Sequence, residues 1–310
     1  MNKIVTVTGI SGFVGSNLQA YLKETYNVKG VSRKTDNETS LYGYNNIGDL
    51  LTNSKALIHL AGKAHDFKNT TNDAEYFEVN TELTKKLYDH FLKSDCNFFI
   101  YMSSVKAVAD SVNGELTEDE IPNPITHYGK SKLLAEQYIL SKEIPAGKRI
   151  YILRPCMIHG PGNKGNLNLL YKFASKSSPW PLGAFENQRS FCSIDNLLFI
   201  IKELIERKDI PSGIYNVADD EPLSTNELIT LMAESQNRKP RIWKFSKSVI
   251  ERLAQIGDTL HLPLNTERLQ KLTASYVVSN TKIKNAIGKP LPVSSRDGLL
   301  KTFKSLLNNQ

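Results

Sequence analysis

The hydrophobic positions in the first half of the chain form short apolar runs separated by segments of helical periodicity. Runs of this length, rich in β-branched residues, predict buried parallel strands, and helical segments between them predict right-handed crossovers. The pattern therefore predicts an α/β fold with a doubly wound parallel sheet. The expected strands cover residues 4–7, 27–32, 56–62, 97–102 and 149–154.

The first strand runs directly into a glycine-rich turn, Thr8-Gly9-Ile10-Ser11-Gly12-Phe13-Val14-Gly15, and a helical segment follows at 17–23. Three glycines in a loop are also common in ordinary tight turns. Here a strand precedes them and a helix follows, so the helix N-terminus would face a pyrophosphate, as a dinucleotide site requires. The predicted contacts are Gly9, Gly12, Phe13, Val14 and Gly15.

The second strand ends in Ser32-Arg33-Lys34, where a carboxylate would bind the 2′-hydroxyl of NAD. The two cations Arg33 and Lys34 favour the 2′-phosphate of NADP(H) as cofactor, and NAD(H) stays possible if Asp36 folds back. The alternative is a solvated loop without a cofactor role.

Further cofactor contacts are expected at the ends of later strands. Asp49 stands where a third strand would end and could meet the adenine amino group. The small residues after the fourth strand let the backbone lie against the cofactor, whereas His59 is expected to be an interior histidine. Asn80, on a following helix, either bonds to the strand ends or only packs there. This set comprises Asp49, Leu50, Leu60, Ala61, Gly62 and Asn80.

The fifth strand delivers Ser103 and Ser104 to the carboxyl edge of the sheet, and an amphipathic helix is predicted at 125–141. Tyr128 and Lys132 are four residues apart on that helix, so they share one face. The cation would lower the pKa of the phenol, which could then act as a base near neutral pH.

The glycine phrase and the Ser…Tyr-x-x-x-Lys pattern resemble the extended branch of the short-chain dehydrogenase/reductase family, the NAD(P)-dependent epimerases and dehydratases. The resemblance implies Ser104, Tyr128 and Lys132 as catalytic residues. It also implies a Rossmann-like domain at 1–160 plus about 190–215, a smaller α/β substrate domain at 161–189 and 216–310, and a homodimer. Residues 215–218 resemble the strand of the smaller domain. Ser224 and Glu227 have the Ser-x-x-Glu spacing of a capping box, which predicts a helix start there.

The same resemblance implies a UDP-sugar substrate, with Arg189 clamping its diphosphate and Asp195 capping the next helix. The family's usual asparagine near Met157 and its second arginine are absent. The implied substrate-binding residues are Lys63, Ser103, Lys106, Lys164, Asn166 and Arg189.

Dehydratases that resemble this chain carry an Asp-Glu pair where it has Val105 and Lys106, so 4,6-dehydration is disfavoured. Several phrases resemble a bacterial surface-polysaccharide subfamily. Because Arg33 and Lys34 suit an exchangeable NADPH, the favoured reaction is reduction of a UDP-4-keto-6-deoxy-hexosamine. The alternatives are a UDP-glucose or UDP-N-acetylglucosamine 4-epimerase with tightly bound NAD, and a non-catalytic NAD(P)-sensing protein.

Composition narrows the picture further. The 310 residues carry a net charge of +7 without a basic, aromatic-interleaved run, which fits an anionic small substrate and no nucleic acid. Three spaced cysteines imply neither disulfides nor a metal site, and a reduced cytoplasm is expected. No signal peptide and no membrane insertion are expected. Residues 246–272, apolar at helical intervals, are interpreted as core or a dimer face and not as a membrane anchor.

Overall fold

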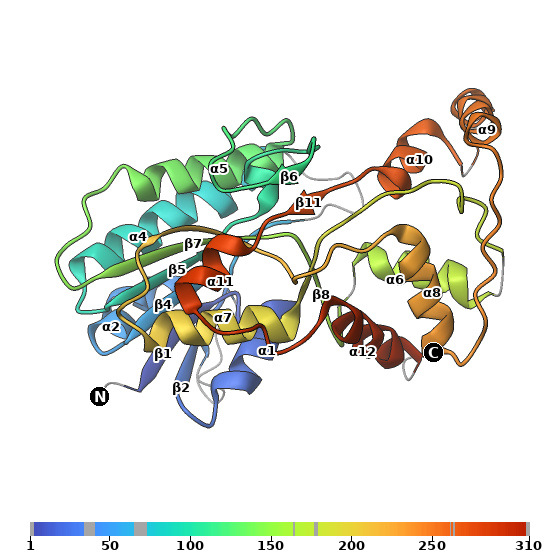
Figure 1. Ribbon diagram of the computed structural model, residues 1–310. Coiled ribbons are helices and arrows are strands. Elements are labelled where there is room, and N and C mark those ends of the chain that lie inside the picture. The colour runs from blue at the N-terminus through green and yellow to red at the C-terminus, as the bar shows by residue number, and fades with distance from the viewer. Residues whose placement is uncertain are drawn as a thin grey trace.

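A seven-stranded parallel sheet forms the centre of the protein (Figure 1). The computed structural model describes residues 3–33, 41–64, 73–163, 165–176, 179–260, 262 and 264–307. The strand order is β10-β7-β5-β4-β1-β2-β3, and every neighbouring pair is parallel. The strands are β1 (Ile4–Thr8), β2 (Asn27–Val31), β3 (Leu41–Tyr42), β4 (Ala56–His59), β5 (Phe98–Met102), β7 (Arg149–Pro155) and β10 (Gly213–Val217).

Helices cover both faces of this sheet, and each layer encloses its own hydrophobic cluster (Figure 1). One layer contains α1 (Phe13–Leu22), α7 (Ile194–Glu206) and α11 (Thr281–Ile287). The other contains α2 (Ile47–Thr52), α4 (Leu83–Lys93) and α5 (His127–Leu140). The predicted doubly wound, Rossmann-like sheet is therefore confirmed.

The chain reverses its direction across the sheet between β1 and β4, which are neighbours although β2 and β3 come between them in sequence. A crevice opens at such a switch point, outside the carboxyl ends of the strands. The glycine-rich turn follows β1, and residues 60–62 follow β4. Both segments thus lie at the place where ligands bind in this class of sheet.

The remaining helices gather at one side of the sheet around a third hydrophobic cluster (Figure 1). They are α6 (Asn166–Ser175), α8 (Thr225–Ser235), α9 (Lys247–Leu260), α10 (Thr266–Thr273) and α12 (Ser295–Leu307). The predicted capping box begins α8, because Ser224 accepts a hydrogen bond from the Glu227 N–H and the Glu227 carboxylate accepts one from the Ser224 N–H. Two small parallel sheets join these helices to the core: β6 (Glu115–Leu116) with β11 (Val277–Val278), and β8 (Met157–His159) with β9 (Phe191–Ser193).

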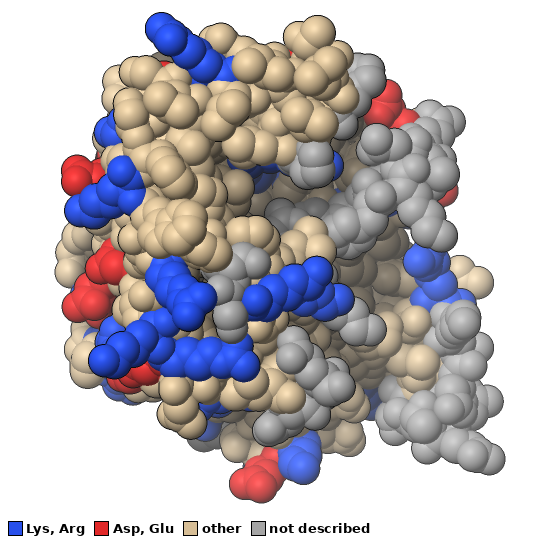
Figure 2. All heavy atoms as spheres, turned by 90° about the vertical axis from the view of Figure 1, so that its right-hand side faces the viewer, with Lys and Arg blue, Asp and Glu red and all other residues tan. Residues whose placement is uncertain are grey.

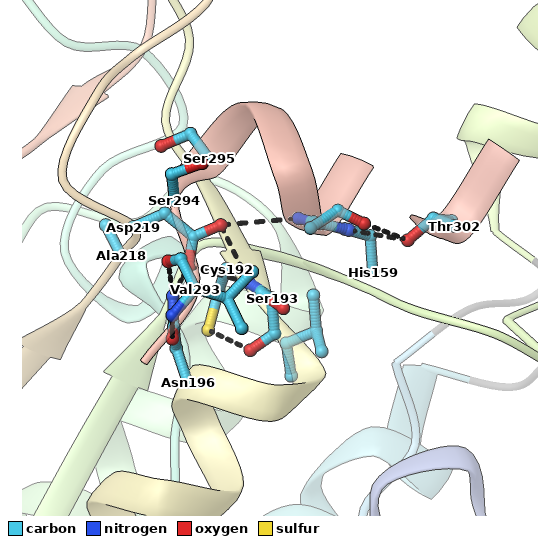
Figure 3. Close-up of polar contacts among 12 residues, drawn as sticks. His159, Cys192, Ser193, Asn196, Ala218, Asp219, Val293, Ser294, Ser295 and Thr302 are labelled. Atoms are coloured by element: carbon cyan, nitrogen blue, oxygen red, sulfur yellow. Dashed lines mark hydrogen bonds and ion pairs between the residues drawn. The ribbon is translucent and has the colours of Figure 1, made fainter. Parts of the chain in front are cut away.

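A buried polar cluster connects β8, β9, α7 and α12 (Figure 3). The Asp219 carboxylate accepts hydrogen bonds from the Ser193 N–H at 2.9 Å and from the Asn196 side chain at 2.6 Å. His159 lies between Asp219, at 3.3 Å, and the Thr302 hydroxyl, at 2.9 Å. Because these partners come from four elements, the cluster fixes how the C-terminal helices meet the sheet.

Several sequence predictions need correction. Residues 47–52 form α2 instead of leading out of a third strand, because Ile47, Leu50 and Leu51 bury one helical face; Asp49 is therefore an exposed residue in its first turn. Residues 215–217 belong to β10 at the edge of the central sheet, paired with β7, and not to a strand of a smaller domain. The cap position of α7 is Ser193, whereas Asp195 lies in its first turn and pairs with Lys301.

Candidate active site

The turn between β1 and α1 is packed so closely that side chains at Gly9 and Gly15 would collide with backbone. A Cβ on Gly15 would lie 2.3 Å from the Gly9 carbonyl oxygen, and one on Gly9 would lie 2.7 Å from the Ala61 nitrogen. Gly9 also has a φ of +71°, a conformation that other residues adopt only with strain. These positions can hold only glycine.

The start of α1 offers a binding surface for a phosphate. Gly12 occupies the cap position and has no side chain to bond the first-turn N–H groups of the helix. Phe13 and Val14 begin the helix, and both pack against the first hydrophobic cluster. A cradle that a Cβ would fill, below free helix N–H groups, fits the pyrophosphate of a dinucleotide.

Asn80 holds the loop after β4 in place. It is fully buried in a π-helical turn, η2 (Glu78–Glu82), a feature frequent at functional sites. Its side-chain oxygen accepts from the Lys63 N–H at 2.8 Å, and its amide donates to the Lys63 carbonyl at 3.0 Å and to Ser131 at 2.9 Å. A Cβ on Gly62 would lie 3.0 Å from both Asn80 Oδ1 and Lys132 Nζ. Asn80 therefore joins the loop to α5 and acts on it as a positioning residue.

His59 is the interior histidine that the sequence predicts. It is fully buried, 2.7 Å from the Thr8 hydroxyl through one ring nitrogen and 2.9 Å from the Thr84 hydroxyl through the other. The Thr8 hydroxyl also accepts a hydrogen bond from the Ala61 N–H. Burial, and secondarily the Lys132 charge, lower the pKa of His59 to about 3, so the ring is neutral and ties β1 to β4.

The structure brings Ser104, Tyr128 and Lys132 together at the carboxyl edge of β5. Ser104 caps a short 3-10 turn, η3 (Val105–Ala107), where its hydroxyl accepts a hydrogen bond from the Lys106 N–H at 3.2 Å, and it lies close enough to the Tyr128 phenol to lower the pKa of that group. The ammonium of Lys132, one helical turn farther along α5, donates to the Met102 carbonyl at 2.8 Å and lies 4.9 Å from the centre of the Tyr101 ring. The predicted helix begins at His127, where the Thr126 side chain accepts from the Gly129 N–H and caps it.

The electrostatics of this group differ from the expectation. Burial raises the pKa of Tyr128, and the nearby Ser104 side chain opposes that rise only in part. Burial lowers the pKa of Lys132 to about 8, while the nearby Glu136 carboxylate acts in the opposite direction. The spacing rule correctly placed the two groups on one face, but desolvation dominates the phenol.

Ser103, the residue before Ser104, belongs to a different environment. Its hydroxyl donates to the Glu136 carboxylate, which also forms a buried ion pair with Arg154 through hydrogen bonds of 2.5–3.2 Å. Successive residues of an extended segment point to opposite sides, which explains the division of roles between the two serines. Ser103 is therefore part of a buried network behind Lys132.

Lys106 and Arg189 lie close together around Tyr276. The Lys106 ammonium donates to the Asp110 carbonyl at 2.9 Å and lies 4.4 Å from the centre of the Tyr276 ring. Burial lowers the pKa of both cations. The Arg189 charge lowers the pKa of Lys106 further, whereas Tyr276 opposes the lowering of the pKa of Arg189. Arg189 donates to the Lys271 carbonyl at 2.6 Å. Two partly desolvated cations side by side form a site suited to an anion.

Lys63 lies near the Ser104, Tyr128 and Lys132 group, on the side of α3 (Asp73–Phe77). Its ammonium pairs with Glu75 at 2.6 Å and lies 5.7 Å from the Tyr76 ring centre. The Tyr76 ring in turn packs edge-on against Tyr128, with 6.4 Å between centres. Helix α3 therefore lines the space next to the phenol through Tyr76.

The part of the site predicted to hold the adenosine of the cofactor is lined by both cationic and acidic residues. Arg33 lines a cavity of about 730 Å³ together with Tyr44, Lys86 and His90, but Glu75, Glu78 and Glu82 line it too. The Arg33 charge opposes the burial-driven rise in the pKa of Tyr44, so the two lie close together. Leu50 is buried in the second hydrophobic cluster, and Leu60 packs against the first. Lys34, Lys164 and the side chain of Asn166 lie outside the described residues.

Three residues near the group were not predicted from the sequence: Thr8, Glu136 and Tyr276. Glu136 follows Lys132 by four positions on α5, a spacing that could have revealed it. Tyr276 reaches the site from the far end of the chain, where its hydroxyl donates to the Ala109 carbonyl at 2.7 Å. No local pattern marks a contact over that separation.

A profile of the NAD dependent epimerase/dehydratase family matches residues 5–218. The chain belongs to this family. It is an NAD(P)-dependent enzyme of the nucleotide-sugar epimerase and reductase type, as the sequence predicted. The matched region contains the glycine-rich turn and the Ser104, Tyr128 and Lys132 group.

Three curated relatives illustrate the range of the family. A UDP-glucose 4-epimerase of Vibrio cholerae is 29% identical, and the match covers 99% of this chain and 96% of the relative. An N-acetyl-alpha-D-glucosaminyl-diphospho-ditrans,octacis-undecaprenol 4-epimerase of Escherichia coli O157:H7 is 28% identical over 77% of this chain and 74% of its own length. A GDP-6-deoxy-D-mannose reductase of Pseudomonas aeruginosa is 27% identical over 76% and 80%.

Solved structures share the fold. The structure described as MoeE5 in complex with UDP-glucuronic acid and NAD superimposes with a TM-score of 0.75 at 22% identity, over 99% of both chains.

Among the described residues of this protein, no helix is both long and apolar enough to cross a bilayer. In the same residues no three His, Cys, Asp or Glu side chains form a metal-binding group, and the three cysteines are unpaired.

Proposed function

We propose that this enzyme oxidises and reduces C4 of a nucleotide-activated hexose, and that its overall reaction is the 4-epimerisation of a UDP-hexose. The observation that carries the proposal is the Ser104, Tyr128 and Lys132 group at the carboxyl edge of β5, beside the glycine-rich turn. The 4-epimerase of Vibrio cholerae, which the chain matches over nearly its full length, supports epimerisation over net reduction.

The roles of the three residues are those that the family resemblance implies, and the geometry supports them. The Ser104 hydroxyl lies close enough to the Tyr128 phenol to affect its pKa, so together the two groups can hold the oxygen on the reacting carbon. Tyr128 takes the proton from that oxygen when the carbon is oxidised and returns it on reduction. Lys132, whose hydrogen bond to the Met102 carbonyl occupies one of its three donors, would orient the nicotinamide ribose and support the phenolate.

A bound nicotinamide dinucleotide supplies the hydride acceptor and donor. Gly9, Gly12 and Gly15 would hold its pyrophosphate against α1, and Asn80 would hold the Gly62 loop against its ribose. Val105 is buried in the first hydrophobic cluster and Lys106 packs on Tyr276, so no acid–base pair stands there for a dehydration.

The diphosphate of the substrate would bind between Lys106 and Arg189. Both cations are partly desolvated, so an anion between them interacts more strongly than it would in water. Lys63, paired with Glu75 next to the aromatic ring of Tyr76, would line the sugar side of the site. Lys164 and Asn166 remain predicted contacts.

The test is a turnover assay with UDP-N-acetylglucosamine and UDP-glucose, without added cofactor, with the product sugar resolved by NMR. We expect interconversion with the C4 epimer and a loss of at least about 100-fold in kcat for Tyr128→Phe. The control is Tyr138→Phe on the same helix, whose hydroxyl bonds only to Asp89 among the described residues. Equal rates for Tyr128→Phe and the parent protein would contradict the catalytic role.

A second candidate is reduction of a UDP-4-keto-6-deoxy-hexosamine, because Arg33 follows β2 where NAD-dependent enzymes commonly present a carboxylate. Titration of the purified protein with NADPH and NADH separates the two. An empty protein that binds NADPH better, and loses this preference in Arg33→Ala, would favour the reductase. Tightly retained NAD would favour the epimerase.

Two organisational features belong to the proposal. We place a dinucleotide-binding domain at 1–160 plus about 190–217. It includes β10, because this strand pairs with β7. A smaller nucleotide-sugar-binding domain comprises 161–189 and 218–310, around the third hydrophobic cluster. We also propose a homodimer that works in the cytoplasm, where nucleotide sugars and dinucleotides are available.

A further inference from the structure

Helix α9 has two apolar faces, of which only one is covered. Ile250, Ala254 and Gly257 pack into the third hydrophobic cluster or against the following loop, as the sequence predicted for core residues. A second stripe is exposed, each side chain at 49–62% of its maximum: Val249, Leu253, Ile256 and Leu260. Their spacing of four, three and four residues places them on one line along the helix.

Neighbouring residues widen this stripe. Trp243 and Phe245, just before the helix, are exposed and pack edge-on with 5.9 Å between ring centres. Leu262, just after it, is exposed as well. We call these three residues together with the stripe the α9 face. Large exposed apolar residues gathered on one helix and on the segments next to it mark an interaction site.

The charges around the α9 face are mostly positive. Residues 237–262 contain six Lys or Arg and only two acidic residues, Glu251 and Asp258. At 3.6 residues per turn both acids lie about 170° from the stripe, and Lys247 lies on their side of the helix, over the Phe185 ring. Asp258 is further held there by hydrogen bonds to Thr266, while Arg252 borders the stripe.

A cationic cavity adjoins the same segment. It has a volume of about 280 Å³ and is lined by Arg238, Lys239 and Arg241, with Phe173 and Trp180 forming apolar walls. Gln236 lines it too, and its buried amide nitrogen has no hydrogen-bond partner among the described residues. Cations, a spare donor and an apolar wall are what the headgroup and upper acyl chain of an anionic phospholipid would contact.

We propose that the α9 face docks the enzyme onto an anionic membrane surface, with α9 lying in the plane of the lipid headgroups. Exposed apolar residues bordered by Lys and Arg, with a tryptophan at the edge, are the properties of an interfacial helix. Figure 2 shows this end of the molecule: a broad region without charged side chains in its upper part, Lys and Arg side chains across the middle, and both Lys or Arg and a few Asp or Glu side chains at the edges. The helix does not cross the bilayer, in agreement with the lack of a spanning helix among the described residues.

The charge favours a bilayer over a second copy of the chain. Two-fold pairing would place the α9 face on itself and bring the cations of both copies together. Like charges in such an interface oppose association. Anionic lipid headgroups neutralise the same cations.

The test is flotation of the full-length protein with vesicles of phosphatidylcholine, alone or with about one third phosphatidylglycerol. We expect binding only to the anionic vesicles, and loss of binding at about 0.5 M salt. The double variant Leu253→Ser/Ile256→Ser should bind at least about ten-fold more weakly. Leu140→Ser, an equally exposed leucine at the end of α5, is the matched control and should bind like the parent.

Fluorescence gives an independent readout. The emission of Trp243 should shift to the blue on addition of anionic vesicles, and Trp243→Phe should remove the shift, because the other tryptophan, Trp180, is already buried. Absence of binding to anionic vesicles would overturn the proposal. Equal binding to both kinds of vesicle would overturn its electrostatic part. A dimer that Leu253→Ser/Ile256→Ser dissociates, without vesicle binding, would show that a second copy covers the face instead.

Discussion

The cofactor side and the substrate side of the site are built in different ways. On the cofactor side the backbone itself forms the binding surface: Gly15 and Gly9 leave no room for a Cβ, and Asn80 fixes the loop from both directions. On the substrate side the binding groups are the ends of long side chains, Lys106 and Arg189, supported by Tyr276. Substitutions should therefore abolish function on the first side and weaken it by degrees on the second.

The largest effect is expected for Gly15→Ala. The added methyl would lie 2.3 Å from the Gly9 oxygen and 2.6 Å from the Ile10 Cα, so the turn and α1 must move apart. We expect dinucleotide binding to fall at least about 100-fold, measured by fluorescence titration, since the pyrophosphate contacts depend on this geometry.

Gly48→Ala is the control for that change. Its nearest atom would be His90 Nδ1 at 3.8 Å, and alanine suits the interior of α2 better than glycine. The control should bind dinucleotide like the parent and unfold at an equal or higher temperature. Unchanged binding in Gly15→Ala would show that the turn yields more than its packing indicates.

The next largest effect is expected for the buried Glu136–Arg154 ion pair, which lies behind Lys132. Glu136→Gln leaves the buried Arg154 guanidinium without its counter-charge, which should lower the free energy of unfolding by about 3–5 kcal/mol. Urea denaturation measures this. Glu82→Gln, which affects an exposed pair with Lys85, should change stability by less than about 1 kcal/mol. Equal losses in the two variants would mean that the buried network is not structurally important.

The difference between features set by local spacing and features set by distant contacts also decides what could be predicted from the sequence. The glycine turn, the shared face of Tyr128 and Lys132, the interior His59 and the α8 capping box all depend on local spacing, and all four were predicted correctly. Local spacing determines turns, caps and helix faces.

The errors arose where a distant partner decides. Strand β10 joins the central sheet by pairing with β7, more than 50 residues earlier in the chain. No pattern within residues 213–217 indicates that β7 is the partner strand. Ser103 and Ser104 are adjacent and chemically identical, and only the burial of Glu136 and Arg154 separates their roles. The pKa of Tyr128 follows from desolvation, which depends on the whole fold and not on the helix that carries the residue.

A third prediction concerns pH and the buried ammonium of Lys132. Its pKa is about 8 in the folded protein and near 10.5 in the unfolded chain, so the unfolded chain binds more protons between these values. The free energy of unfolding should therefore gain up to about 3 kcal/mol from this group as pH rises from 8 to 10.5, and nothing below pH 8. The difference between the parent and Lys132→Met, followed by urea denaturation against pH, isolates the contribution. A difference that stays constant over this range would contradict the lowered pKa.

The smallest effect is expected on the substrate side, for Arg189→Gln. The variant keeps the backbone pairing of residue 189 with Leu223 and loses one charge next to Lys106, so the fold and the dinucleotide site should be unaffected. We expect KM for the nucleotide sugar to rise about ten-fold with kcat within about two-fold, because a diphosphate clamp stabilises the ground state and the transition state equally. Arg296→Gln removes an exposed arginine paired with Glu234 and serves as the control, with KM unchanged. A fall in kcat without a change in KM would instead place Arg189 at the reacting carbon, and the difference between a rigid cofactor side and an adjustable substrate side would then no longer hold.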